Sequence, residues 1–198
     1  MNGKIRLPLW TAVFIICFLF YGVFVYAMKS DACEQGEKIA MAARAYISNE
    51  NLRYDESYVA GGYPEENRGV CTDVVWSAFM KNGISLKYLV DKDIEMNPKA
   101  YAAVIRVPDP NIDFRRVEVL EVFFERNAQR LTTDLDAVWE WMPGDIVIFE
   151  SSHIAIVSDF RNVWGRPYVI QHGKDPAAEE DRLWASDGMQ VSGHYRWP

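Results

Sequence analysis

The sequence predicts an α+β fold: one domain in which N-terminal helices pack on a small antiparallel sheet, preceded by one transmembrane helix. Helical patterns occupy the first half of the body and strand patterns the second half, whereas a parallel α/β sheet requires the two to alternate. The 198 residues are 49% hydrophobic and 14% aromatic, which is enough for a single core. We therefore divide the chain into an anchor or signal segment, residues 1–30, and an α+β domain, residues 31–198.

The N-terminal segment is defined by an uncharged apolar run between residues 9 and 28. About 20 helical residues span the hydrocarbon core of a bilayer. Lys4 and Arg6 precede the run and favour a cytoplasmic N-terminus with an exported body, although Lys29 weakens this asymmetry. We expect an uncleaved single-pass anchor. A cleaved signal peptide is the competing interpretation, although no clean small-x-small cleavage site follows the run.

The first half of the body is predicted to be helical, with turns between the helices. Residues 34–48 are rich in alanine and lack proline, as is typical of a helix. Glycines and a proline mark residues 51–69 as turns. A second helix begins near Cys71 and ends at Asn82-Gly83. Its apolar residues recur at helical spacing on one face: Cys71, Val74, Val75, Ala78 and Phe79.

Residues 86–107 have no decisive periodicity, and the two prolines of residues 108–111 predict a loop. Residues 117–126 again have one apolar helical face. The remainder favours strands. Three short runs rich in β-branched residues are predicted as strands, and a turn between the last two predicts an antiparallel hairpin. They comprise residues 145–149, 153–158 and 168–172.

Charge and histidine spacing exclude several classes of partner. The net charge is −7, and no basic stripe is interleaved with aromatic residues, so we expect no nucleic acid partner. The three histidines are not spaced as paired metal ligands, and the sequence has no Cys-x-x-Cys motif. We therefore expect no metal and no cofactor, and a membrane contact only through the N-terminal helix.

Cys71 and His153 are the candidate catalytic pair. Cys71 follows a glycine-containing loop at the first turn of its predicted helix, where backbone N–H groups and the helix dipole favour an anion. We expect this position to lower the thiol pKa and to hold an oxyanion. His153 begins a strand and can act as a general base. Gln171 and His172 lie on the next strand and point to opposite faces, so one of them at most can orient His153.

Each of these residues also has a structural interpretation. A cysteine on an apolar helix face is commonly a small core residue. In an oxidising compartment, Cys71 can instead pair with Cys33 in a disulfide. A histidine at the start of a strand is commonly a hydrogen-bonded structural residue, which leaves the role of His153 open at this point.

Six segments span, in order, nearly all of the part after the apolar run and include the surroundings of Cys71 and His153. They are Arg53-Tyr54, Gly69-Val-Cys-Thr-Asp-Val-Val, Asn111-Ile-Asp-Phe-Arg-Arg-Val, Pro143-Gly-Asp-Ile-Val, His153-Ile-Ala-Ile-Val-Ser-Asp and Gly193-His-Tyr-Arg. Together they resemble the YijF-like bacterial family of unknown function, which looks like a distant branch of the NlpC-type cysteine peptidases with a papain-like core.

This resemblance implies roles for individual residues. Cys71 matches the nucleophile and His153 the base. Gln171 stands where the family usually has the orienting histidine, because the usual Val-Ile-His-Asn reads Val-Ile-Gln-His at residues 169–172. His172 is the alternative orienting residue. Tyr54 matches a tyrosine that often lines the site near the oxyanion.

The expected function is hydrolysis of an amide in the cell envelope by a cysteine peptidase or amidase. The resemblance implies a peptide or peptidoglycan-like substrate and a domain in the periplasm, tethered to the bacterial inner membrane or exported after signal cleavage. A non-catalytic envelope binding module that retains the fold is the alternative. A structural partner of a membrane complex is a third interpretation, with the protein partner unknown.

Three further groups of residues are predicted to be structural. Asp113, Arg115 and Arg116 are expected to form a solvated ion-pair cluster, and a clamp for an anionic substrate is the alternative. Residues 179–181, Glu-Glu-Asp, are expected to lie in a solvated turn. Trp139 and Trp141 are expected to pack in the core or against the sheet, and a groove that binds sugar rings is the alternative. His194 matches a position of the family motif, but its spacing indicates no role.

Overall fold

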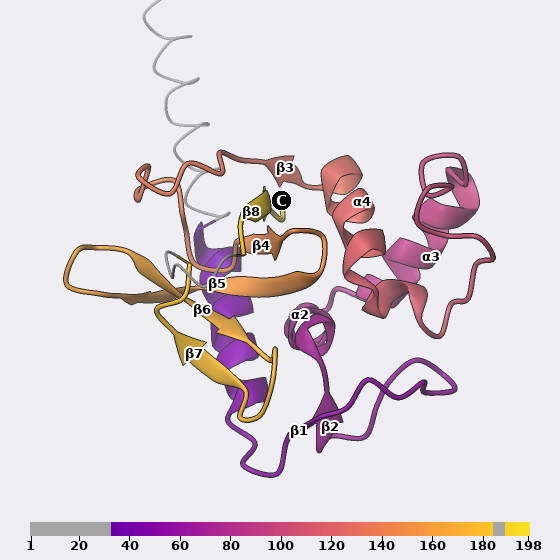
Figure 1. The fold of residues 1–198 in the computed structure, drawn as a ribbon, viewed down its shortest axis with the longest axis horizontal. Coiled ribbons are helices and arrows are strands. Elements are labelled where there is room, and N and C mark those ends of the chain that lie inside the picture. The colour runs from indigo at the N-terminus through magenta and orange to yellow at the C-terminus, as the bar shows by residue number, and fades with distance from the viewer. Residues whose placement is uncertain (1–32, 184–188) are drawn as a thin grey trace, which may run out of the picture.

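The computed structural model describes residues 33–183 and 189–198 (Figure 1). The predicted anchor or signal segment, residues 1–30, lies outside the described residues. Within the part of the chain that is described, no helix is long and apolar enough to cross a membrane.

The domain is α+β, as the sequence predicts, and its main sheet has six antiparallel strands in the order β3-β8-β4-β5-β6-β7. Figure 1 shows this sheet beside the helices α2 to α4. The strands are β3 (Gln129–Arg130), β4 (Ile146–Phe149), β5 (His153–Arg161), β6 (Pro167–Gln171), β7 (Ala178–Glu180) and β8 (Val191–Arg196).

The helices precede the sheet in the sequence, as predicted. A small parallel pair, β1 with β2, lies immediately before α2. Helical residues 33–47 come first; the other elements are β1 (Arg53–Tyr54), β2 (Arg68–Gly69), α2 (Cys71–Lys81), α3 (Leu86–Met96), the 3-10 helix η1 (Asp113–Arg115) and α4 (Val117–Asn127). The stretch 86–107, which has no decisive periodicity, thus contains α3.

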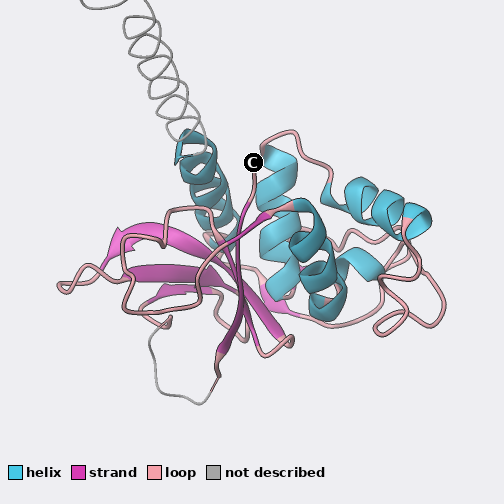
Figure 2. Cartoon of the chain, turned by 90° about the horizontal axis from the view of Figure 1, so that it is seen from above, coloured by secondary structure: helices cyan, strands magenta, loops and turns pink. Residues whose placement is uncertain are grey.

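Strand alternation produces two cores, one on each face of the sheet. Ile154 and Ile156 of β5 face the core that contains α2 and α4, while Ala155 and Val157 face the second core. Figure 2 shows the helices α2 to α4 gathered to one side of the strands. Trp141 is fully buried in the second core, but Trp139 is 73% exposed. Packing in the core is therefore confirmed for Trp141, whereas most of the Trp139 surface is exposed.

Asp73 fixes the beginning of α2 and joins it to η1. Its carboxylate accepts the backbone N–H of Val70 at 2.7 Å and the indole N–H of Trp76 at 2.6 Å. Arg115 donates two further hydrogen bonds to the same carboxylate, at 2.7 and 2.8 Å. The side chains of Asp73 and Arg115 are 0% and 2% exposed. The expected solvated cluster was thus wrong for Arg115, because the fold supplies a buried counterion 42 residues away in the sequence, and wrong for Asp113, which is also buried.

Candidate active site

Cys71 is the first residue of α2, and its side chain is buried against β5. The residue is 7% exposed, and both described cysteines, Cys33 and Cys71, are free thiols. Burial raises the pKa of the Cys71 thiol to about 11, although the backbone N–H groups of Ile154 and Thr72 at the sulfur oppose this shift. The expected lowering of this pKa was wrong, because the desolvation penalty for a thiolate outweighs the effect of the helix N-terminus. Cys71 is therefore a neutral thiol at neutral pH.

His153 begins β5 and contacts Gln171 on the neighbouring strand. The ring Nε2 of His153 lies against Oε1 of Gln171 in a short hydrogen bond. Burial lowers the pKa of His153, while the contact with Gln171 and the nearby charge of Glu180 oppose that shift. His153 is thus held as a neutral imidazole within a polar network, which is the protonation state that a general base requires.

Cys71 lies at the start of β5 on the side of α2, whereas the His153 ring contacts Phe149 of the second core, with centroids 5.9 Å apart. The Cys71 sulfur is next to the N–H of Ile154, which follows His153 in the chain. Among the described residues, no hydrogen bond joins this sulfur to a histidine ring. Catalytic hydrogen bonds are often long without substrate and shorten when it binds. Cys71 and His153 thus lie at the same end of β5, with the sulfur on the side of α2 and the imidazole on the side of the second core.

Two cavities meet at Tyr54. The His153 cavity, about 490 Å³, is lined by Tyr54, His153 and Gln171. The Cys71 cavity, about 240 Å³, is lined by Tyr54 and Cys71 together with Glu56. Tyr54 belongs to both cavities, and its hydroxyl donates to Glu56 at 2.8 Å. The candidate nucleophile and base thus line adjoining spaces, with Tyr54 as the shared wall.

His172 lies apart from the His153–Gln171 pair. Its ring is fully buried, and Nε2 faces the carboxylate of Asp175 at 3.2 Å. The ring of Tyr54 contacts that of His172 edge-on, at 5.4 Å between centroids, and Asp175 also accepts the backbone N–H of Tyr54 at 2.8 Å. His172 and Asp175 therefore support Tyr54, whereas Gln171 contacts His153.

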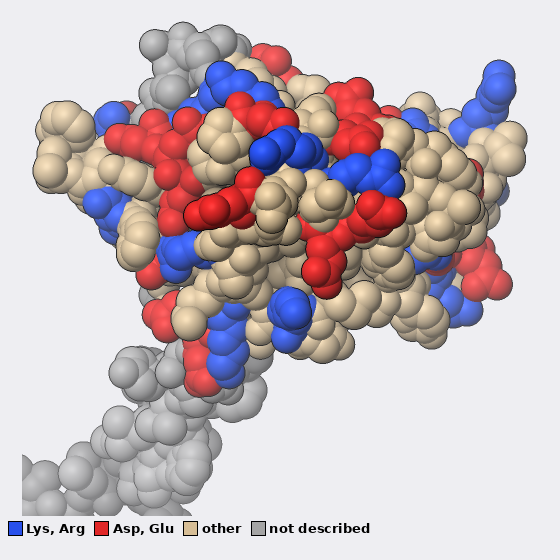
Figure 3. Space-filling view, turned by 90° about the horizontal axis from the view of Figure 1, so that it is seen from below, with Lys and Arg blue, Asp and Glu red and all other residues tan. Residues whose placement is uncertain are grey.

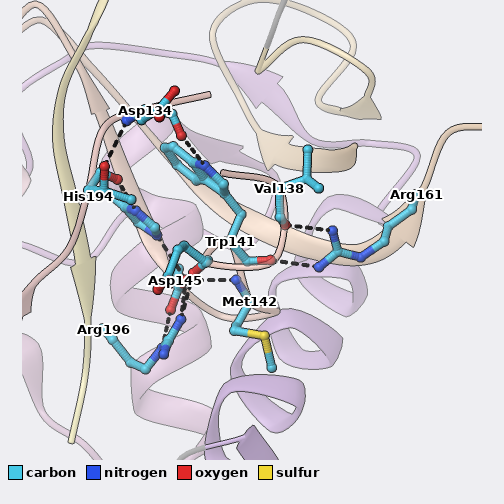
Figure 4. A network of polar contacts seen from close by, with 10 residues as sticks. Asp134, Val138, Trp141, Met142, Asp145, Arg161, His194 and Arg196 are labelled. Carbon is cyan, nitrogen blue, oxygen red and sulfur yellow. Dashed lines mark hydrogen bonds and ion pairs between the residues drawn. The ribbon is translucent and has the colours of Figure 1, made fainter. Parts of the chain in front are cut away.

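His194 is occupied in a separate network (Figure 4). Its Nδ1 lies 2.7 Å from the carbonyl oxygen of Thr132 and its Nε2 lies 2.9 Å from the carboxylate of Asp145. The ring is fully buried and stacks on Trp141 with centroids 3.8 Å apart, and Arg196 makes two hydrogen bonds to Asp145. Both ring nitrogens face acceptors, so His194 is a structural residue on the face of the sheet away from Cys71.

Glu180 contacts the candidate site, a role that the sequence analysis did not predict. Residues 178–180 form the edge strand β7 and not a solvated turn. Glu179 turns to Arg44 and Ser158, while Glu180 accepts a hydrogen bond from the amide Nε2 of Gln171. Two adjacent glutamates on a short polar segment give no strand signal by themselves, because strand runs are recognised from β-branched residues and alternation.

Comparisons with known proteins identify relatives without a described activity. Residues 40–197 match the family described as "Domain of unknown function (DUF1287)". The uncharacterized protein YijF of Escherichia coli (strain K12) is 36% identical over 169 residues, which cover 80% of this chain and 80% of that protein. No solved structure has significant similarity to the chain.

Proposed function

The chain belongs to the DUF1287 family, and we propose that its domain is a cysteine amidase or peptidase of the cell envelope. Cys71 is the nucleophile and His153 the base in this proposal. The observation that supports it best is the placement of the Cys71 sulfur at the amide of Ile154, directly after His153, whose ring is held by Gln171. A cysteine that begins a helix packed on an antiparallel sheet, together with a histidine that begins one of its strands, also favours an NlpC-type, papain-like core.

The reaction begins from a neutral thiol and a neutral imidazole. Because Gln171 presents its oxygen to Nε2, that nitrogen carries the proton and Nδ1 is free to accept one. Nδ1 takes the proton of the Cys71 thiol as the sulfur attacks the amide carbon. The carbonyl oxygen becomes an oxyanion, which the first-turn N–H groups of α2 are suited to stabilise.

Collapse of the tetrahedral intermediate completes the acyl transfer. The C–N bond breaks, the imidazolium gives its proton to the leaving amine, and a thioester remains on Cys71. Water then attacks the thioester with His153 again as base, releasing a carboxylic acid and restoring the thiol. Tyr54 lies between the two cavities, so its ring is placed to contact the substrate on both sides of the scissile bond.

A cell-wall peptide is the proposed substrate, and the periplasmic side of the inner membrane is the proposed location. The His153 cavity of about 490 Å³ falls in the size range of small-molecule and peptide side-chain sites. On the face drawn in Figure 3, basic and acidic side chains are interspersed, and the overall charge is −7. This mixture favours a small peptide substrate over a polyanion such as nucleic acid.

Activity of the full chain on isolated peptidoglycan tests the reaction. Release of new amino groups by the native protein, and none by Cys71→Ala or His153→Ala with unchanged melting temperatures, is the expected result. Full release by either variant contradicts the mechanism. Protease added to spheroplasts tests the location: digestion of the domain is expected, and protection until the inner membrane is lysed contradicts it.

A non-catalytic binding module is the second candidate, and one observation favours it. Cys71 is only 7% exposed, and no hydrogen bond joins its sulfur to His153 in the described chain. In that case peptidoglycan fragments bind to the native protein without being cleaved. Binding that persists in Cys71→Ala, together with no product from the native protein, supports the module over the enzyme.

A further inference from the structure

We propose that Glu180 is a positioning residue of the active site: it fixes the amide orientation of Gln171 and supplies, through that amide, the negative charge that Gln171 lacks. This inference rests on the proposed function of Cys71 and His153. Glu180 does not touch the reacting atoms, and its hydrogen-bonded path to His153 runs through Gln171.

The strand register brings Glu180 to Gln171. In the β6–β7 pair, Gln171 stands opposite Ala178 and Val169 stands opposite Glu180. Gln171 and Glu180 are therefore diagonal neighbours on one face of the sheet, which places long side chains within reach of each other. The amide Nε2 of Gln171 donates to Oε1 of Glu180, while the amide oxygen contacts His153. Glu180 also lines the His153 cavity.

The carboxylate decides which end of the amide faces the histidine. An ionised carboxylate only accepts hydrogen bonds, so the NH₂ group of Gln171 must point to Glu180 and the oxygen must point to His153. The oxygen in turn requires a proton on Nε2 and leaves Nδ1 as the acceptor for the thiol proton. Without Glu180 the amide can turn over. Its NH₂ group would then face Nε2, and the ring proton would move to Nδ1, where it blocks proton transfer from Cys71.

The charge of Glu180 provides the second effect. A neutral amide stabilises an imidazolium less than a carboxylate does. Hydrogen bonding to a carboxylate polarises the amide, so its oxygen becomes a better partner for a charged ring. Arg182 lies 3.7 Å from Glu180, and the Glu180 side chain is 40% exposed, so part of this charge is screened. Lys174 lines the same cavity and carries a positive charge, opposite to that of Glu180.

Alkylation of Cys71 by iodoacetamide tests the proposal without a substrate. The reaction forms an S–C bond and expels iodide, and the thiol proton passes to His153 or directly to solvent. The rate on the Cys71 peptide is measured by mass spectrometry in the full chain from pH 6 to 10. The component that disappears in His153→Ala is the His153-assisted rate. The remaining alkaline component comes from thiolate formed without His153 and serves as the internal control.

We expect Glu180→Gln and Glu180→Leu to reduce the His153-assisted rate and to leave the alkaline component unchanged. A carboxylate bonded directly to a catalytic histidine contributes about 10⁴ in rate. Because Glu180 acts through an amide and is partly screened, we expect a loss of roughly three- to tenfold. Glu180→Leu should cause a much smaller loss in a Gln171→Ala background than in the native protein, because its hydrogen-bonded effect passes through Gln171.

A double exchange separates positioning from a merely structural role. Gln171→Glu with Glu180→Gln moves the carboxylate next to His153 and keeps an amide to bond it, so the assisted rate should return to the native value or exceed it. An unchanged assisted rate in Glu180→Leu, or losses that add to those of Gln171→Ala, overturns the inference. If the alkylation rate of Cys71 depends on pH identically in the native protein and in His153→Ala, the proposed catalytic pair is refuted. This outcome distinguishes failure of the proposed function from failure of the role of Glu180.

Discussion

Replacing Asp73 by asparagine should strongly destabilise the domain, because Asp73 is the buried counterion of Arg115. The two side chains are 0% and 2% exposed and share two hydrogen bonds. The substitution removes the charge and converts one acceptor oxygen into a donor that faces existing donors. Breaking a buried ion pair by removing one partner costs about 3–5 kcal/mol. The cap on the backbone N–H of Val70 is also at risk, and this cap begins the helix that presents Cys71.

Urea unfolding of the full chain in mild detergent, followed by tryptophan fluorescence, measures this effect. With a slope of about 2 kcal/mol per molar urea, the unfolding midpoint should fall by roughly 1.5–2.5 M. Glu95→Gln is the matched control, since it removes one carboxylate from the exposed pair of Lys92 and Glu95 and should leave the midpoint unchanged. A midpoint for Asp73→Asn within experimental error of the native value would refute the reasoning that this pair stabilises the start of α2.

Three further predictions concern the site. Gln171→Ala should reduce turnover, but less than His153→Ala does, whereas His172→Ala should have its main effect through Tyr54 on substrate affinity; comparison of kcat and KM for the single variants checks this. Gly173→Ala should slow turnover about tenfold or more with little change in melting temperature, since its methyl group would lie 3.1 Å from Cε1 of His153 and displace the ring; unchanged kcat would contradict this. In the absence of substrate, the thiolate of Cys71 should form only as the pH rises toward its pKa of about 11. The ultraviolet absorbance of the thiolate should therefore increase in the alkaline range, and a transition below pH 8 would contradict the effect of burial on this pKa.

Much of the candidate site follows from local patterns. Helical spacing of apolar residues after a glycine loop predicts that Cys71 begins a helix, and α2 does begin at that residue. β-Branched runs and the turn between residues 158 and 168 predict the hairpin whose strands bear His153 and Gln171. Alternation along a strand predicts that Gln171 and His172 face opposite ways, and the two residues do have separate partners.

The tertiary structure decided the properties that depend on residues far apart in the chain. The pKa of Cys71 follows from burial beneath elements that only the folded domain brings together, and burial reverses the direction that the helix N-terminus alone would set. The environment of Arg115 depends on Asp73, which no local pattern pairs with it. Glu180 meets Gln171 through the register of an edge strand that has no hydrophobic signal. Periodicity and turn residues encode local backbone structure, whereas desolvation, ion pairing and strand register are set by non-local contacts, so they emerge only when the chain is folded.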